Sequence, residues 1–305
     1  MSTREEKNRD IQKEIENDEL REKRKKITII FFKTIFITVF LFSSFYFYTK
    51  YISTNSIIVK EKRLVEKNLP QSFNGIKIIQ FSDIHYTTKS DLENLKKTIK
   101  LINKRNPDVV IFTGDLIEKD SNITTEESEL IIKQLSQISA SIGKYAVTGD
   151  QDEESFTTIM KQSDFTILDN NYDFIYNNTN EPILIVGLSS IKQQRNIEKA
   201  FEYTKKDNNL NNIYTLLVLH EADSIDEILN NYHVNIALAG HSLNGQICLT
   251  KNLCFIKKEN STKYYKEFYK LNDTKLFISS GIGSPYPNFR IMARPSINFF
   301  RLALE

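Results

Sequence analysis

The stretch from Ile76 to Tyr86 reads Ile-Lys-Ile-Ile-Gln-Phe-Ser-Asp-Ile-His-Tyr, and its two halves differ in character. The first half is apolar and β-branched, which is typical of a buried strand. The second half places a carboxylate, Asp83, and an imidazole, His85, two residues apart at the end of that strand. Open α/β sheets bind ligands at the carboxyl ends of their strands, and Asp and His there can hold a transition metal. The pair alone is equally compatible with a helix-capping Asp and a surface His.

Four further apolar runs also end in residue types that ligate metals. The predicted strands are Val109–Phe112, Tyr145–Val147, Leu216–Leu219 and Val234–Ala239, and they are followed by Asp115, Asp150, His220 and His241. Amphipathic helices are predicted over Leu92–Ile102 and Glu126–Ile138, so the chain alternates as α/β layers do. Neighbouring strand ends converge in space, and three of the four histidines fall at these ends. The pattern predicts a shared crevice that holds divalent ions and clamps phosphoryl oxygens.

These motifs, in this order, resemble those of the calcineurin-like metallophosphoesterases, and most closely a membrane-anchored bacterial branch of that family. The residues that carry the resemblance are Ser82-Asp83-Ile84-His85, Gly114-Asp115, His220, Gly240-His241 and Gly245-Gln246, with closing motifs at Ser280–Gly283 and Arg294–Ile297. The resemblance extends from about Ile57 to the C-terminus. It implies an α/β fold, a four-layer α/β/β/α sandwich of two mixed β-sheets, preceded by one transmembrane helix.

The family's arrangement implies two metal sites that share Asp115. One site would use Asp83, His85, Asp115 and a second histidine of the fourth motif, where this chain has Leu243. The other would use Asp115, Asp150, His220 and His241. We therefore expect one or two divalent ions (Mn, Fe or Zn), with one sound site and one weakened site in which Asn244, Asp152 or water replaces the missing ligand. His233 fits no motif and is interpreted as structural.

The third motif also departs from the family, where it reads Gly-Asn-His-Asp or Gly-Asn-His-Glu. Here it is Gly149-Asp150-Gln151-Asp152, and Gln151 cannot carry a proton to a leaving group. Loss of a general acid commonly lowers a rate by roughly 10²–10⁴-fold. We predict a metallophosphoesterase that hydrolyses a phosphate mono- or diester with activated hydroxide, using Asp115, Asp150, Gln151 and Asp152 as catalytic residues. The alternatives are a catalytically impaired protein that binds metal or phosphate and a purely structural tethered domain.

The N-terminal region is predicted to anchor the chain in a membrane. Residues 1–26 are a charged tail, expected to be solvated and poorly ordered or helical, and residues 27–49 are apolar enough to span a bilayer. The basic cluster precedes the span, so the positive-inside rule places the tail in the cytoplasm and the rest outside the cell membrane. Bulky aromatics follow the apolar run, which favours an uncleaved anchor over a signal peptide. A linker with a charged edge strand (50–72) then leads to the phosphoesterase domain (73–305).

The remaining features concern partners. The net charge of +2 indicates no nucleic-acid partner, whereas the anchor would hold the domain near phospholipids or polyprenyl phosphates. The substrate is therefore expected to carry phosphate and to be lipid-linked.

Cys248 and Cys254 face each other across a predicted hairpin. An oxidising exterior would allow a disulfide, but the sequence favours two small buried thiols.

Overall fold

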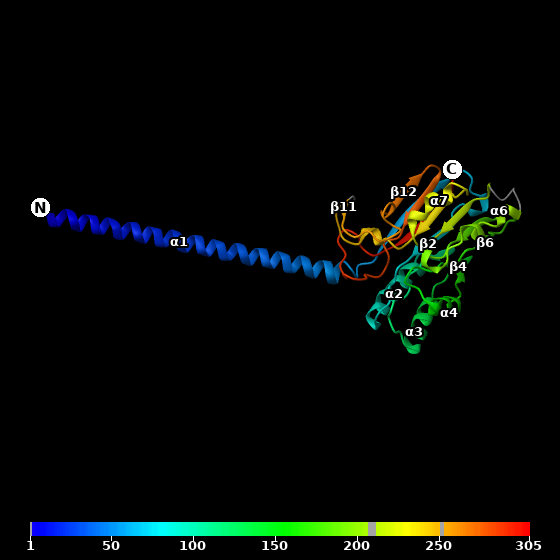
Figure 1. The fold of residues 1–305 in the computed structure, drawn as a ribbon, viewed down its shortest axis with the longest axis horizontal. Helices are drawn as coiled ribbons and strands as arrows, with labels where there is room; N and C mark the ends of the chain where they lie inside the picture. Colours follow the sequence, from blue (N-terminus) through cyan, green and yellow to red (C-terminus); the bar gives the residue numbers. More distant parts are fainter. Residues whose placement is uncertain (1, 207–211, 251–252) are drawn as a thin grey trace. The chain divides into compact units, whose positions relative to one another are not determined.

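The computed structural model describes residues 2–206, 212–250 and 253–305, which form two units, Met1–Thr49 and Lys50–Glu305. The first unit is a single helix, α1 (Ser2–Phe47), drawn in blue in Figure 1. The charged tail belongs to this helix, and ion pairs such as Lys25–Glu22 (2.8 Å), one turn apart, support it there. Among the described residues, one helical stretch, Glu6–Ile52, is long and apolar enough to cross a membrane. It consists of most of α1 and the short π-helical segment Tyr48–Ile52 that continues it.

The second unit contains two six-stranded mixed sheets. The first sheet has the order β1 (Ile58–Glu66), β14 (Ser296–Leu304), β2 (Lys77–Phe81), β3 (Val109–Phe112), β4 (Gly143–Ala146), β5 (Thr166–Ile167). The second has the order β12 (Phe268–Leu271), β13 (Thr274–Ile278), β9 (Ile236–Ala239), β8 (Thr215–Val218), β7 (Ile183–Gly187), β6 (Asn171–Ile175). The predicted charged strand is confirmed as β1, which lies at the edge of the first sheet, parallel to β14.

Alternation along the buried strands explains the layers. In β3, Val109 and Ile111 face the second sheet, while Val110 and Phe112 face helices on the other side. Those helices are α2 (Lys89–Asn103), α3 (Thr125–Leu135) and α4 (Glu154–Gln162). The outer face of the second sheet is covered by α5 (Ile197–Ala200), α6 (Tyr203–Lys206) and α7 (Ile225–Leu229). Figure 1 shows α2, α3 and α4 together on one flank of this unit, away from α7. The predicted four-layer α/β/β/α sandwich is confirmed.

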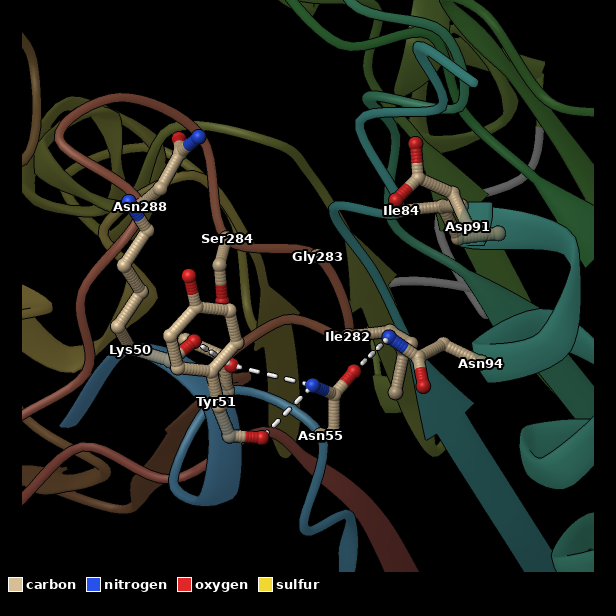
Figure 2. Close-up of a pocket in the computed structure, with 11 residues that line it drawn as sticks. Lys50, Tyr51, Asn55, Ile84, Asp91, Asn94, Ile282, Gly283, Ser284 and Asn288 are labelled. Carbon is tan, nitrogen blue, oxygen red and sulfur yellow. Dashed lines mark hydrogen bonds between the residues drawn. The ribbon is translucent and has the colours of Figure 1, made fainter. Parts of the chain in front are cut away.

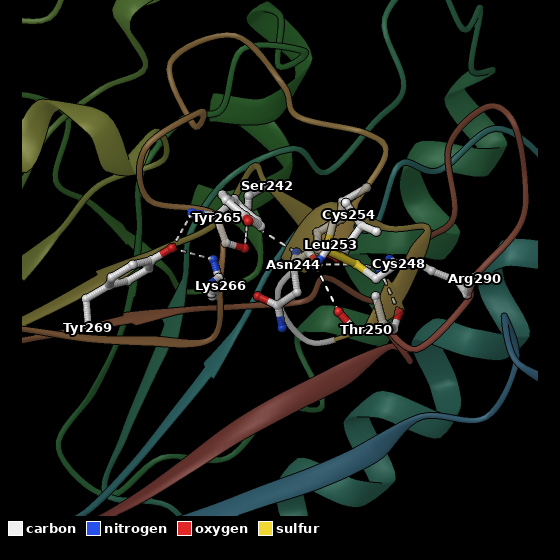
Figure 3. The surroundings of a disulfide bond; sticks show 12 residues. Ser242, Asn244, Cys248, Thr250, Leu253, Cys254, Tyr265, Lys266, Tyr269 and Arg290 are labelled. Atoms are coloured by element: carbon white, nitrogen blue, oxygen red, sulfur yellow. Dashed lines mark hydrogen bonds between the residues drawn. A yellow bond between two sulfur atoms is a disulfide. The ribbon is translucent and has the colours of Figure 1, made fainter.

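The two cysteines form a disulfide, so the predicted preference for free thiols was wrong. Cys248 and Cys254 lie opposite each other in a small hairpin of β10 (Cys248–Thr250) and β11 (Leu253–Cys254), as Figure 3 shows. Gly245 packs against this hairpin, because a Cβ at that position would lie 2.5 Å from Cys254 Cβ. The disulfide therefore braces the loop that follows His241. The sequence could not settle this point because two cysteines at this spacing fit a hairpin either as free thiols or as a disulfide.

The disulfide can be checked by counting thiols. Denatured protein prepared without reductant is expected to show no free thiol, and reduced protein two per chain, because the sequence has only two cysteines. A thiol reagent on unfolded protein measures both values, with the double variant C248S/C254S as the blank. Two reactive thiols before reduction would show that the bond does not form.

Candidate metal centre

The predicted ligands meet at the carboxyl ends of five strands in two neighbouring sheets. Asp83 and His85 follow β2, Asp115 follows β3, Asp150 follows β4, His220 follows β8 and His241 follows β9. The backbone turns sharply after several of these strands, because φ is positive at Asp83, His85, Asp115 and His241. Asp and His tolerate this conformation better than most residues, and such strain gathers at functional sites. The local backbone thus directs four of the ligand side chains, two aspartates and two histidines, toward the centre.

The first group of ligands is Asp115, Asp150, His220 and His241, all buried. His220 Nε2 lies 3.2 Å from Asp115 Oδ2 and 3.3 Å from Asp150 Oδ1. His241 Nδ1 lies 3.0 Å from Asp150 Oδ1. The other ring nitrogens contact backbone carbonyls, since His220 Nδ1 is 2.6 Å from Thr113 O and His241 Nε2 is 2.9 Å from Glu259 O. Metal-ligating histidines are typically oriented in this way, by a carbonyl on the far nitrogen.

The second group is Asp83, His85 and Asp115. His85 Nε2 lies 3.7 Å from Asp83 Oδ1 and 3.6 Å from Asp115 Oδ2. On the far side of the ring, Nδ1 is 2.7 Å from Glu118 Oε2, a residue that the sequence analysis did not single out. Asp115 belongs to both groups, so its carboxylate stands between them. The structure therefore brings together all six predicted metal ligands.

The electrostatics of the two groups fit a bound cation. Asp115 Oδ2 and His85 Nε2 are buried without a hydrogen-bond partner among the described residues. Burial opposes charge on His220, but Asp115 and Asp150 outweigh it and hold the pKa of its imidazole well above the usual range. Burial likewise opposes charge on His85, yet Asp83 and Glu118 raise its pKa to about 9. Buried carboxylates need compensating positive charge, and mixed oxygen and nitrogen ligands suit a divalent transition metal.

Glycines allow the strand ends to approach each other. A Cβ on Gly149 would lie 2.2 Å from Asp115 Oδ1, and one on Gly114 would lie 2.7 Å from His220 Nδ1. Gly114 also has a φ of 92°. Both Gly-Asp pairs of the sequence are thus required by space, and the pair at Gly114 is required by backbone conformation as well.

Leu243 lies beside the second ligand group. It is fully buried, and a Cβ added to Gly281 would lie 2.6 Å from Leu243 Cδ2 and 2.8 Å from Asp83 Cβ. The side chain that replaces the family's second histidine is therefore next to Asp83. Asn244, by contrast, lies beside the two cysteines (Figure 3) and lines a cavity together with them. The structure does not bring Asn244 into the ligand groups.

The third motif contributes unequal parts. Asp152 accepts hydrogen bonds from the backbone N–H groups of Asp115, Leu116 and Gly149 at 2.7–2.8 Å. Its carboxylate thus ties the end of β3 to the end of β4, which is a positioning role. The pKa of this carboxyl is raised to about 7, mainly by burial and secondly by the negative charge of Asp115. The side-chain amide of Gln151 donates to Asp150 Oδ2 at 2.6 Å, so Gln151 lies directly at the ligands.

The metal pocket opens through a cavity of about 240 Å³. It is lined by Asp150, Gln151, Lys192, Glu221, His241, Lys258, Glu259 and Asn260. Lys192 Nζ is 2.7 Å from Asp150 Oδ2. The sequence analysis did not single out Lys192 or Lys258, because both lie between strands and outside any motif. The mouth combines cations with the ligand carboxylate, which suits an anionic substrate.

A second cavity, of about 200 Å³, lies behind the first motif (Figure 2). Asn55 joins two parts of its wall, because it donates to Tyr51 O at 2.8 Å and accepts from Asn94 Nδ2 at 2.9 Å. Ile84, between the ligands Asp83 and His85, also lines it. The segment that follows the apolar helix therefore shares a polar cavity with the metal-binding loop.

Arg290 is a buried support that the sequence did not indicate. Its guanidinium is fully buried and donates to the carbonyls of Ser280 (2.6 Å), Ala293 (3.2 Å) and Leu243 (3.3 Å), and to that of Gly283. The loop it holds backs the first motif, since Gly283 N donates to Asp83 O at 2.7 Å. Arg290 therefore fixes the backbone around Asp83.

Replacing Arg290 with methionine is expected to lower the free energy of unfolding by about 3–5 kcal/mol, because several buried carbonyls lose a charged donor. Chemical denaturation of the full chain measures this. The matched control is R301M, which removes an exposed arginine paired with Glu61 and is expected to change stability by about 1 kcal/mol or less. Equal effects of the two substitutions would contradict the assigned role of Arg290.

The four-layer fold, with aspartates and histidines at the ends of its strands, defines a protein of the metallophosphoesterase class. The chain belongs to the calcineurin-like phosphoesterase family, whose model matches residues 76–245. It is 29% identical to the uncharacterized metallophosphoesterase YkuE of Bacillus subtilis over 262 residues, covering 84% of this chain and 89% of YkuE.

Two more distant relatives carry more specific names. A transmembrane protein with metallophosphoesterase domain from Danio rerio is 24% identical, covering 76% of this chain and 54% of that protein. The UDP-2,3-diacylglucosamine pyrophosphatase LpxG of Chlamydia trachomatis is 30% identical over 94 residues, covering 30% of this chain and 28% of LpxG. The predicted family is therefore confirmed.

Proposed function

We propose that this protein is a membrane-anchored, metal-dependent phosphoesterase. The observation that carries the proposal is the sharing of Asp115 between two buried ligand groups, within each of which the donor atoms lie within 4.8 Å of one another. Asp115, Asp150, His220 and His241 would hold one divalent ion (Mn, Fe or Zn). Asp83, His85 and Asp115 would hold a second, more weakly, because Leu243 offers no ligand atom.

Divalent ions at these positions would polarise a phosphoryl oxygen and lower the pKa of water. The chain's own residues would orient the phosphate ester at the mouth of the pocket and exclude bulk water from the buried ligands. Asp152 would hold the loops of Asp115 and Gly149 in place through its three backbone contacts. Gln151 would donate a hydrogen bond from its amide without transferring a proton, so we expect turnover to be slow for poor leaving groups.

The substrate we propose is a phosphate ester at the membrane surface. Helix α1 is long and apolar enough for an anchor, and the segment that follows it lines a polar cavity shared with the metal-binding loop. The disulfide favours an oxidising compartment, which agrees with an extracytoplasmic domain and a cytoplasmic N-terminus. The names of the Danio rerio protein and of LpxG add support for a membrane location and for a lipid-linked phosphate.

A second candidate function is a metal- or phosphate-binding protein with impaired catalysis. Gln151 and Leu243 favour it, because they replace a proton carrier and a metal ligand of the family pattern. It requires the same ligand groups and differs only in turnover.

The test is hydrolysis by the full chain in detergent. Mn²⁺-loaded protein is expected to cleave p-nitrophenyl phosphate or bis(p-nitrophenyl) phosphate, to lose the activity with EDTA and to regain it with Mn²⁺. A phospholipid monoester presented in vesicles should be cleaved faster by the anchored chain than a soluble ester of the same leaving group. Metal uptake without any turnover would favour the second candidate, and absence of uptake would exclude both.

A further inference from the structure

Hydrogen bonds at both ends of the loop that carries Lys192 attach it to residues close to the metal ligands. Lys192 lies in a short 3₁₀ turn, Ile191–Gln193, which follows β7. Glu221, the residue directly after the ligand His220, is buried and accepts hydrogen bonds from Ser190 Oγ and from Ile191 N (3.3 Å). The fixed position of His220 therefore also fixes the start of this turn.

The other end of the turn is fixed just as firmly. Gln193 Nε2 donates to Asp152 O at 2.7 Å, so the turn is tied to the loop of Asp150. Arg195 pairs with Glu221 and its Nε donates to Ser189 O at 2.8 Å. These contacts occupy Glu221 with structural partners. Lys192, between the two anchors, is left as the side chain that the turn presents to the pocket.

The Lys192 ammonium contacts a ligand of the metal. Its Nζ is 2.7 Å from Asp150 Oδ2, while Asp150 Oδ1 faces His241 Nδ1 at 3.0 Å. The Lys192 side chain is 55% exposed, so its end can move within the mouth of the pocket without unfolding anything. The Gln151 amide lies at the same oxygen, at 2.6 Å. Lys192 thus places a mobile positive charge beside the residue that replaces the family's histidine.

We propose that Lys192 is a substrate-binding residue that exchanges partners, pairing with Asp150 when the pocket holds no ion and with a phosphate oxygen when it does. This rests on the proposed function. A divalent ion held with His220 and His241 at Asp150 Oδ1 would neutralise the charge of this carboxylate, which weakens the pairing of Lys192 with Oδ2 and frees the lysine. The released ammonium then meets the phosphate ester, whose oxygens are its natural partners. The chemical class recognised is a phosphate group with free anionic oxygens.

If Lys192 exchanges partners in this way, replacing it should raise the affinity for Mn²⁺ and lower the affinity for phosphate. In K192Q, Mn²⁺ is expected to bind roughly threefold or more tightly in the absence of phosphate, because a competing cation is gone. Inorganic phosphate is expected to bind the Mn²⁺-loaded variant about tenfold or more weakly, because a charge-assisted hydrogen bond is lost. Isothermal titration of the full chain in detergent measures both affinities. K192R should restore most of the phosphate affinity.

The matched control is K199Q, which removes an exposed lysine seven positions away on the same segment and should leave both affinities unchanged. Wild-type protein that binds Mn²⁺ and phosphate, together with a K192Q phosphate affinity within twofold of it, would overturn this assignment and leave the proposed function standing. Wild-type protein that takes up no Mn²⁺ would overturn the proposed function and this inference with it.

Discussion

Asparagine in place of Asp115 is expected to weaken Mn²⁺ binding by more than about 100-fold, because changes outside the ligand shell already weaken it by roughly 10–100-fold. Asp115 contacts ligands of both groups, with Oδ2 3.2 Å from His220 Nε2 and 3.6 Å from His85 Nε2. Loss of its charge would therefore affect both proposed ion positions, and the proposed phosphoesterase turnover should fall at least as far. Equilibrium dialysis with metal analysis measures the affinity, and aryl phosphate hydrolysis the rate.

The chain offers a closely matched control at Asp120. Asp115 and Asp120 have nearly the same backbone conformation, with φ of 61° and 62°, and asparagine suits both. Asp120 is exposed and lies outside the ligand groups. D120N should therefore bind Mn²⁺ and turn over as the wild type does. A D115N variant that keeps wild-type metal affinity would show that Asp115 is not a ligand shared by the two proposed sites.

Histidine in place of Leu243 is expected to add one tightly bound Mn²⁺ per chain. Leu243 lies beside Asp83 near Gly281, where a fourth ligand for the weakened site is missing. Its φ is 52°, a conformation that histidine tolerates better than leucine, so the substitution suits the backbone. Because a Lewis acid contributes several kcal/mol to phosphoryl transfer, turnover should rise at least about tenfold. Metal analysis after dialysis and steady-state kinetics measure the two effects.

Glycine at the same position separates the ligand from the removal of leucine. L243G suits the positive φ and offers no ligand atom, so its metal stoichiometry should stay at the wild-type value. If L243H also left the stoichiometry unchanged, position 243 would not be the missing ligand position, and the single departure at Leu243 would not explain a weakened site.

Much of the centre could be predicted from the sequence because its ligands follow buried strands. The five apolar runs are followed by Asp83, Asp115, Asp150, His220 and His241, and parallel pairing of β2, β3 and β4 in one sheet and of β8 and β9 in the other places these ends at the same edge of each sheet. The local sequence pattern, an apolar run followed by Asp or His, was therefore enough to predict which residues form the ligand groups. The two-sheet fold followed from the resemblance to the family, which the fold confirms.

The supporting residues could not be predicted in the same way. Arg290 lies far along the chain from Asp83, and its buried guanidinium finds its partners, four backbone carbonyls and the Ser284 hydroxyl, only once the loop is folded. Lys192 and Glu118 stand in loops with no periodicity, and only tertiary contacts place them at Asp150 and His85. The role expected for Asp152 changed for the same reason, since its backbone partners come from two separate strand ends.

The most direct measurement is anomalous scattering from crystals soaked in Mn²⁺. We expect a peak within coordination distance of Asp115, Asp150, His220 and His241, and a weaker peak beside Asp83 and His85. Crystals that show no manganese at the first of these positions, at a concentration that loads other sites, would contradict a metal centre formed by these strand ends.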